Sequence, residues 1–298
     1  VVAGGSFGFI YNGTVLQRIN IDGDVYISPG AGIDVWNSST NNIMSIGGSV
    51  YNNSNNTVAP QASPSVMRFL SGGNRCDVIF TGNRSTVVTS NPALTTTPVT
   101  VFNKVTINKG SSPDTTITWN IGGTLTTPQD NWLTLQNGSL VYQRTGNLTV
   151  STTTDFIIPS SAGLILNTPS NVYISNNAGT ETVYLNGRLS MIGGGGNVYI
   201  GPAGNTSGNA DIEYSGSGAS LLEIQAGNLF VNGQIRRPLA STNGTLTYRQ
   251  TGGNVYIFGN NANAAKAKLE VLNDGSEFSM SGGTLTIVRG GGTTFGDI

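Results

Sequence analysis

Histidine is absent from this 298-residue chain, and cysteine occurs once, at Cys76. Histidine is the commonest general base and a frequent metal ligand, so its absence excludes Ser-His-Asp and Cys-His nucleophile sites and ordinary zinc sites. A single cysteine cannot form an internal disulfide, and Cys76 lies in the run Cys76-Asp77-Val78-Ile79-Phe80. We therefore expect Cys76 to be a small core residue, and we expect neither a metal site nor a cofactor.

Charged residues are also scarce. The chain has 14 Lys and Arg against 15 Asp and Glu, a formal net charge of −1. This balance offers no electrostatic footprint for a phosphate backbone, so nucleic acid is not an expected partner. No run approaches the roughly 18 apolar residues of a membrane helix, so we expect no membrane insertion. The chain opens without Met or a signal segment, which favours a piece of a longer or processed protein.

Small polar residues dominate what is present. The 42 Gly, 34 Asn, 35 Thr and 29 Ser make up nearly half of the chain. Gly and Asn are poor helix formers, whereas 37 % of the residues are apolar, many of them Val, Ile, Leu, Tyr and Phe. The composition therefore indicates an all-β fold rather than helices or disorder.

A short unit, a turn residue followed by an apolar-x-apolar triplet, recurs along the chain. The copies are Asn147-Leu148-Thr149-Val150, Asn171-Val172-Tyr173-Ile174, Asn197-Val198-Tyr199-Ile200, Asn228-Leu229-Phe230-Val231, Asn254-Val255-Tyr256-Ile257 and Thr284-Leu285-Thr286-Ile287. From Leu148 the first apolar position advances by 24, 26, 31, 26 and 30 residues. Further alternating segments between the copies give about three short strands per period. We predict a right-handed parallel β-helix, or β-solenoid, with three short strands per coil.

The repeat also predicts a register. Alternate side chains of a strand share one face, so Val172 and Ile174 should point inward and lie under Val198 and Ile200. The Asn before each strand falls at a corner, where Asn and Gly tolerate left-handed backbone angles, and stacked Asn side chains can form an amide ladder. The expected ladder consists of Asn147, Asn171, Asn197, Asn228 and Asn254. Alternatively, Asn merely suits a tight turn.

The domain prediction divides the chain at residue 100. Residues 1–100 are interpreted as irregular N-terminal coils with long loops, at Ser49–Ser65 and Ser85–Pro98, and residues 101–298 as regular β-helix coils. We expect one continuous solenoid, a fragment of a longer protein. A separate β-sandwich domain over the first hundred residues is the alternative.

Catalytic residues are not expected. A glycoside hydrolase needs two carboxylates on one face, and the candidates are Asp22 with Asp24 and Glu213 with Glu223. The first pair lies in a turn-like context. Glu213 and Glu223 alternate with apolar residues, which predicts solvated, outward-facing positions. Arg236 and Arg237 could serve a lyase, but no acidic cluster lies near them in sequence. The chain is therefore expected not to be an enzyme.

An outward aromatic stripe is the main candidate for binding. Tyr173, Tyr199, Phe230 and Tyr256 occupy the middle of four successive triplets and should stack on the surface. Aromatic rings in a row suit the apolar faces of sugar units, which makes these four residues candidate glycan-binding residues. Stacking that only stabilises the coils is the alternative interpretation.

Several turn-strand phrases resemble those of a known class of surface protein. They are Gly196-Asn197-Val198-Tyr199-Ile200, Gly252-Gly253-Asn254-Val255-Tyr256-Ile257, Ser281-Gly282-Gly283-Thr284-Leu285-Thr286-Ile287 and Asn103-Lys104-Val105-Thr106-Ile107-Asn108-Lys109. They are similar to the repetitive β-solenoid adhesins of gliding Bacteroidetes, which the type IX secretion system exports. Filamentous haemagglutinin-like and autotransporter passenger solenoids have similar Gly-, Asn- and Thr-rich repeats.

The resemblance implies an extracellular, cell-surface location and a non-catalytic role as an adhesive or filamentous stalk. The implied partners are surface glycans or abiotic surfaces, other segments of the same long chain, and components of the secretion system. The alternative function is that of a polysaccharide lyase or hydrolase of the β-helix class.

Overall fold

The computed structural model shows an all-β chain. It describes residues 6–9, 15–29, 31–35, 41–54, 67–68, 70–71, 74–91, 98–176, 180–204, 209–216, 219–259 and 266–288. None of these residues is helical, and accordingly no helix among them is long and apolar enough to cross a membrane. The chain divides into two compact units, residues 1–140 and 141–298.

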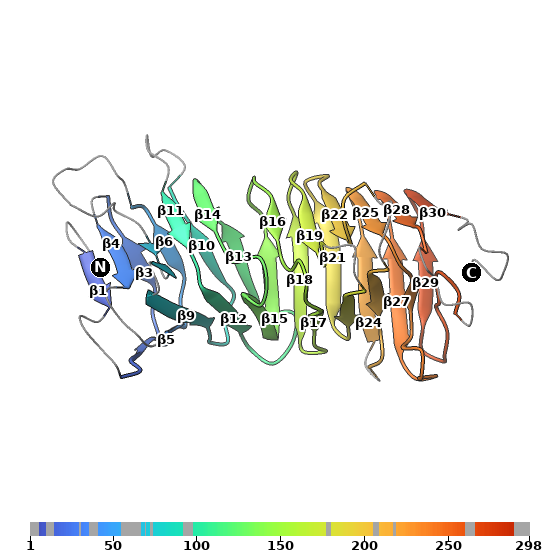
Figure 1. Ribbon diagram of the computed structural model, residues 1–298, viewed down its shortest axis with the longest axis horizontal. Coiled ribbons are helices and arrows are strands. Elements are labelled where there is room, and N and C mark those ends of the chain that lie inside the picture. The colour runs from blue at the N-terminus through green and yellow to red at the C-terminus, as the bar shows by residue number, and fades with distance from the viewer. Residues whose placement is uncertain are drawn as a thin grey trace. The chain divides into compact units, whose positions relative to one another are not determined.

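Parallel strands stack in three faces in the C-terminal unit (Figure 1). The first face contains β16 (Leu148–Thr149), β19 (Val172–Ile174), β22 (Asn197–Ile200), β25 (Asn228–Val231), β28 (Asn254–Ile257) and β30 (Thr284–Ile287). The second contains β17 (Phe156–Ile158), β20 (Thr182–Leu185), β23 (Asp211–Glu213) and β26 (Ile235–Arg236). The third contains β18 (Ala162–Asn167), β21 (Arg188–Gly193), β24 (Ala219–Ile224), β27 (Thr245–Gln250) and β29 (Glu277–Met280). The predicted β-solenoid with three strands per coil is confirmed.

The predicted register of the first face is confirmed as well. Val172 pairs with Val198, and Ile174 pairs with Ile200. These inward side chains are at most 2 % exposed, whereas the residues between them are only half-buried. Burial of apolar side chains contributes about 25 cal/mol per Å², and in a solenoid the neighbouring coil provides most of that burial.

The N-terminal unit also has three faces. One contains β1 (Ser6–Phe9), β4 (Gly32–Val35), β7 (Met67–Arg68), β11 (Val99–Val101) and β14 (Thr124–Thr126). Another contains β2 (Arg18–Ile21), β5 (Asn41–Ile46), β9 (Asn74–Phe80), β12 (Lys104–Asn108) and β15 (Leu133–Tyr142), with the short β8 (Leu70–Ser71) antiparallel to β9. The third contains β3 (Val25–Ile27), β6 (Val50–Asn52), β10 (Thr86–Thr89) and β13 (Thr116–Asn120).

The core of the N-terminal unit is partly aromatic. Phe102 stacks on Trp119 with ring centroids 5.1 Å apart, and Phe80 meets both rings edge-on. All three side chains are at most 1 % exposed. Cys76 is fully buried, as predicted, and burial raises the pKa of its thiol to about 12. The thiol is therefore protonated at neutral pH.

The long loops predicted before residue 100 need one correction. The stretch Ser85–Pro98 begins with strand β10, because Val88 is fully buried and Val87 and Thr89 alternate with it. Residues 92–97 lie outside the described residues. In the other stretch, Ser49–Ser65, β6 occupies Val50–Asn52, and residues 55–65 lie outside the described residues. The division at residue 100 and a single continuous solenoid stay predictions.

Glycine builds the corner before three strands of the first face, β25, β28 and β30. Gly227, Gly253 and Gly283 have φ of +79°, +64° and +77°, a region that only glycine enters without strain. A Cβ on Gly253 would lie 2.6 Å from the carbonyl oxygen of Gly227, so a side chain does not fit there. Asn228 and Asn254 have no positive φ and already belong to their strands. At these three corners the left-handed angle therefore belongs to glycine, one of the two residue types expected there.

Candidate functional site

Asparagine side chains form an amide ladder along the first face of the C-terminal unit. Asn197 Nδ2 donates to Asn171 Oδ1 at 3.0 Å, and Asn228 and Asn254 each donate to the preceding Asn at 2.8 Å. Asn147 takes part differently, because its Oδ1 accepts the backbone N–H of Asn171 at 3.1 Å. In-register parallel pairing places Asn197 beside Asn228 and Asn228 beside Asn254, which brings each amide to the next.

The aromatic stripe runs beside this ladder. Successive ring centroids of Tyr173, Tyr199, Phe230 and Tyr256 are 5.2, 5.0 and 5.0 Å apart, with interplanar angles of 11°, 10° and 7°. The rings follow the strand pairing, in which Tyr173 lies beside Tyr199 and Phe230 beside Tyr256. Asn171 Nδ2 also donates to the Tyr173 hydroxyl at 3.1 Å, so the ladder and the stripe are linked.

The stacking limits how this stripe can hold a ligand. A sugar packs on the free face of an aromatic ring. Tyr199 and Phe230 each have a neighbouring ring on both faces, so only ring edges and the Tyr199 hydroxyl remain for a ligand. The pKa of Tyr199 is raised, mainly by burial and to a lesser extent by the neighbouring Tyr173. The hydroxyl therefore stays protonated and can donate a hydrogen bond.

A second candidate site, which we call the charged cluster, lies on the second face of the C-terminal unit. It comprises Asp211, Glu213, Arg236, Arg237, Lys266 and Glu270. Arg236 contacts Asp211 at 2.7 Å and Glu213 at 2.6 Å. Strands β23 and β26 bring them together, because Glu213 pairs with Arg236 in register.

Burial determines the protonation chemistry of these carboxyl groups. The side chains of Asp211, Glu213 and Arg236 are 3 %, 12 % and 5 % exposed. Burial raises the pKa of Asp211, although the hydrogen bond from the N–H of Gln234 and the positive charge of Arg236 both act to lower it. The pKa of Glu213 is also raised by burial, although Arg236 opposes the shift. The prediction that Glu213 is a solvated outward residue is therefore wrong, because its carboxylate pairs with an arginine one coil away.

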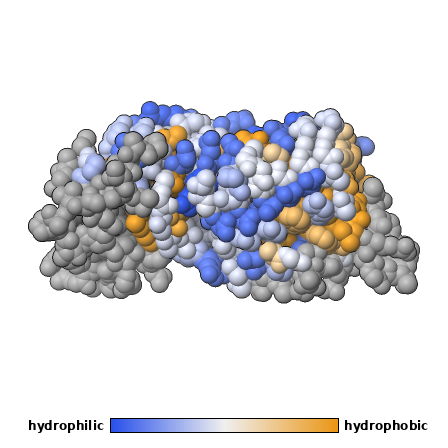
Figure 2. Space-filling view, turned by 90° about the horizontal axis from the view of Figure 1, so that it is seen from above, coloured by the Kyte–Doolittle hydropathy of each residue, from blue (hydrophilic) through white to orange (hydrophobic). Residues whose placement is uncertain are grey.

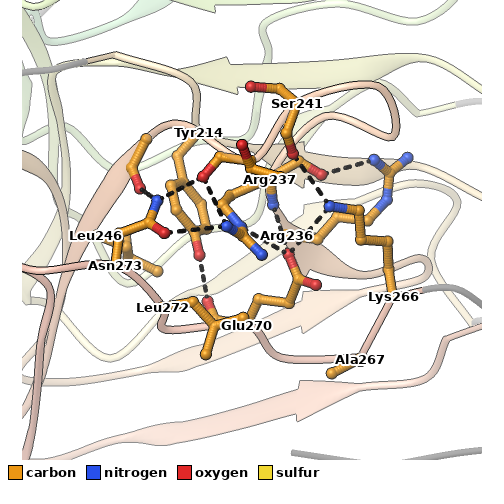
Figure 3. Close-up of polar contacts among 12 residues, drawn as sticks. Tyr214, Arg236, Arg237, Ser241, Leu246, Lys266, Ala267, Glu270, Leu272 and Asn273 are labelled. Carbon is orange, nitrogen blue, oxygen red and sulfur yellow. Dashed lines mark hydrogen bonds and ion pairs between the residues drawn. The ribbon is translucent and has the colours of Figure 1, made fainter.

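Arg237 and Glu270 form the other half of the charged cluster (Figure 3). The backbone N–H of Arg237 donates to Glu270 at 3.1 Å, and its guanidinium donates to the Thr242 carbonyl at 2.7 Å and to Asn273 at 3.1 Å. Lys266 lies 3.8 Å from the Glu270 carboxylate. Three cations thus balance three carboxylates.

Tyr214 lies next to the charged cluster, with its hydroxyl directed at the backbone of Glu270 (Figure 3). Its hydroxyl donates to the carbonyl of Glu270 at 2.7 Å, and its side chain is fully buried. Burial, followed by the charge of Glu270, raises the pKa of Tyr214 to about 12. The tyrosine is therefore a structural donor at neutral pH, without an ionisation that a reaction could use.

Glu223 occupies a separate position on the third face. It accepts hydrogen bonds from Arg188 at 2.9 Å, Ser190 at 3.0 Å and Gln225 at 3.1 Å. Burial raises the pKa of Glu223, but the hydrogen bonds from Gln225, Ser190 and Arg188 outweigh it and lower the pKa overall. The prediction of a solvated Glu223 is wrong, since its side chain is 8 % exposed.

The predicted carboxylate pairs are not assembled as pairs. Glu213 lies on β23 and Glu223 on β24, two different faces of the solenoid. Asp22 and Asp24 lie in the turn between β2 and β3, where Asp24 accepts the N–H of Ser49 at 2.7 Å and contacts Arg84 at 3.0 Å. Within the described residues, no group of three or more Cys, Asp or Glu side chains is arranged to hold a metal ion.

Comparison with known proteins gives no relative. No protein-family model, no curated protein and no solved structure matches this chain.

Proposed function

We propose that this chain is a non-catalytic structural and adhesive segment of a cell-surface or secreted protein. The observation that carries the proposal is the repetition of one outward pattern: Asn171, Asn197, Asn228 and Asn254 bond in a row beside four stacked rings. Such a pattern stabilises the coils and presents a uniform surface, whereas a catalytic site needs different groups converging on one point.

The charged cluster supports the same proposal. Arg236 and Arg237 are each occupied by carboxylates, and the side chains of Arg236 and Asp211 are at most 5 % exposed. A general acid or base must come within hydrogen-bond reach of its substrate. Because these arginines and carboxylates are buried and paired with one another, they are better suited to stabilising the coils than to acting as a general acid or base.

The finer assignment rests on the resemblance of the turn-strand phrases. An adhesin of the gliding Bacteroidetes type, exported by type IX secretion, would display the stripe of Tyr173, Tyr199, Phe230 and Tyr256 to a glycan or an abiotic surface. Ring edges, the tyrosine hydroxyls and the amide ladder would make the contacts. Other segments of the same long chain and secretion components are the remaining proposed partners.

Binding measurements test this proposal. The purified chain is expected to be retained by at least one immobilised polysaccharide or mineral surface, and the double substitution Tyr199→Ser with Tyr256→Ser should weaken the retention. The matched control is Tyr26→Ser, at an exposed tyrosine outside the stripe. Failure of all surfaces to retain the chain, or equal retention of both variants, would contradict the role of the stripe.

A polysaccharide lyase or hydrolase is the second candidate. One observation favours it: Glu213 is the most exposed carboxylate around Arg236, and its raised pKa suits a general acid. Incubation with pectins, alginates and neutral glycans, followed by analysis of chain length, tests it. Cleavage that Glu213→Gln abolishes and Glu223→Gln preserves would establish this second function.

A further inference from the structure

Inward side chains are exposed on the last described strand of the third face. Phe278 and Met280 are 49 % and 40 % exposed, whereas their register partners on β27, Tyr248 and Gln250, are fully buried. The ring of Phe278 covers that of Tyr248, with centroids 5.0 Å apart. Each coil therefore buries the inward residues of the preceding coil. Among the described residues, no further coil buries Phe278 and Met280 of β29.

Hydrophobic surface gathers on this part of the molecule. Figure 2 shows it toward the C-terminal end of the described chain, beyond a band of hydrophilic residues. Leu272 is also 48 % exposed, although it lies outside the strands. Within the part of the chain that the structure describes, β29 pairs only with β27 and β30 only with β28. A strand edge with free N–H and C=O groups above an apolar surface is suited to pairing with another strand.

Strand β2, at the end of its face in the N-terminal unit, is also incompletely covered. Ile19 and Ile21 of β2 are half-buried, whereas their register partners Met44 and Ile46 on β5 are 1 % and 2 % exposed. Among the described residues β2 pairs only with β5. The chain thus has an incompletely covered strand near each end of its described sequence.

The two strands match residue by residue. β2 reads Arg18-Ile19-Asn20-Ile21, and β29 reads Glu277-Phe278-Ser279-Met280. Each has a charged residue first, apolar residues at the second and fourth positions, and a polar residue between them. The charges are opposite, and Arg18 and Glu277 are both exposed. Opposite charges at matching positions fix the register of strand pairing.

We propose that copies of this chain associate head to tail, with β29 of one copy pairing in parallel with β2 of the next. Glu277 then lies opposite Arg18, Phe278 opposite Ile19 and Met280 opposite Ile21. We infer that the partner of the β29 edge is a second copy of this chain. Strand β29 itself covers the inward residues of β27, so a strand of the same pattern, such as β2, is suited to cover those of β29. A head-to-tail contact leaves a free edge at each end, so the assembly grows into a filament. This inference does not depend on the adhesive role.

Sedimentation velocity over a concentration series tests the proposal on the complete 298-residue chain. The mean mass is expected to rise continuously with concentration beyond the dimer. Glu277→Lys places two cations opposite each other and should raise the concentration needed for half-assembly by about tenfold. Arg18→Glu should have the same effect, and the two substitutions combined in one chain should restore assembly.

Phe278→Lys and Ser279→Lys form the matched pair for the apolar contact. Phe278→Lys puts a charge on the inward face and should abolish assembly, while Ser279→Lys, on the outward face of the same strand, should preserve it. Unchanged far-UV circular dichroism shows that each variant is folded. A monomer at all concentrations would overturn the proposal. Dimers that grow no further, or a charge swap that restores nothing, would also overturn it.

Discussion

Asn197 and Asn228 are 31 residues apart in sequence, but their side chains are hydrogen-bonded, with Asn228 Nδ2 donating to Asn197 Oδ1 at 2.8 Å. Asn197 in turn donates to Asn171. An amide in the middle of the ladder therefore makes two ladder bonds. Asn254 makes one, because its partner on β30 is Thr284, which carries no amide.

This difference predicts unequal losses of stability. A hydrogen bond contributes about 1 kcal/mol net, so Asn197→Ala should lower the free energy of unfolding by about 2 kcal/mol and Asn254→Ala by about 1 kcal/mol. Chemical denaturation of the two variants measures both values. Equal losses, or losses close to zero, would show that these asparagines serve only their turns.

Removal of the buried arginine should be far more costly than removal of an exposed one. Arg236→Gln leaves Asp211 and Glu213 buried without their shared cation, which costs about 3–5 kcal/mol. Arg84→Gln removes a surface pair with Asp24, in which the arginine side chain is 66 % exposed, and should cost less than about 1 kcal/mol. Urea unfolding of both variants checks the contrast, and similar losses would contradict a buried charged cluster.

The two glutamates predict opposite dependences of stability on pH. The pKa of Glu223 is lowered in the folded state, so its contribution is present above its ordinary pKa of about 4.3 and is lost as pH falls through the folded value. The stability difference between the wild type and Glu223→Gln should therefore grow as pH rises from about 3 to 5. Denaturation at several pH values measures it.

For Glu213 the sign is reversed. Its pKa is raised, so the folded state holds the proton more tightly and stability falls as pH rises from about 4.3 through the folded value. The advantage of the wild type over Glu213→Gln should shrink over that range. The same series of denaturation curves provides the test, and parallel trends for both glutamates would refute the assigned environments.

Cys76 should resist modification in the native state. Its thiol is fully buried and has a pKa raised to about 12, whereas the thiolate is the reactive form. Ellman's reagent at pH 8 is expected to react with the chain only after denaturation. Rapid reaction of the folded chain at the same pH would contradict the placement of Cys76 in the core.

The first face of the C-terminal unit was predictable because sequence and structure share one period there. The triplets Val172-Tyr173-Ile174 and Val198-Tyr199-Ile200 alternate inward and outward, and copies of the triplet recur 24 to 31 residues apart, so the register followed directly. The stacked rings and the row of amides are consequences of that register.

The charged cluster was not predicted, because its members lie in three short segments that are far apart in sequence. Glu213 and Arg236 are 23 residues apart, close to one coil, so the repeat length itself was a signal that could have paired them. Alternation with apolar residues predicted an outward Glu213 but could not show that the guanidinium of Arg236, one coil away, pairs with its carboxylate. The strand at Thr86–Thr89 was missed because a Thr-rich stretch reads as a turn, although Val88 faces the core.

The most direct test of the proposed function measures retention and cleavage in the same samples. The purified chain is incubated with a panel of immobilised and soluble polysaccharides, and both the bound protein and the newly formed chain ends are quantified. The proposal predicts binding that Tyr199→Ser with Tyr256→Ser weakens, with no new chain ends. Chain ends that accumulate with time and disappear in Glu213→Gln would contradict it.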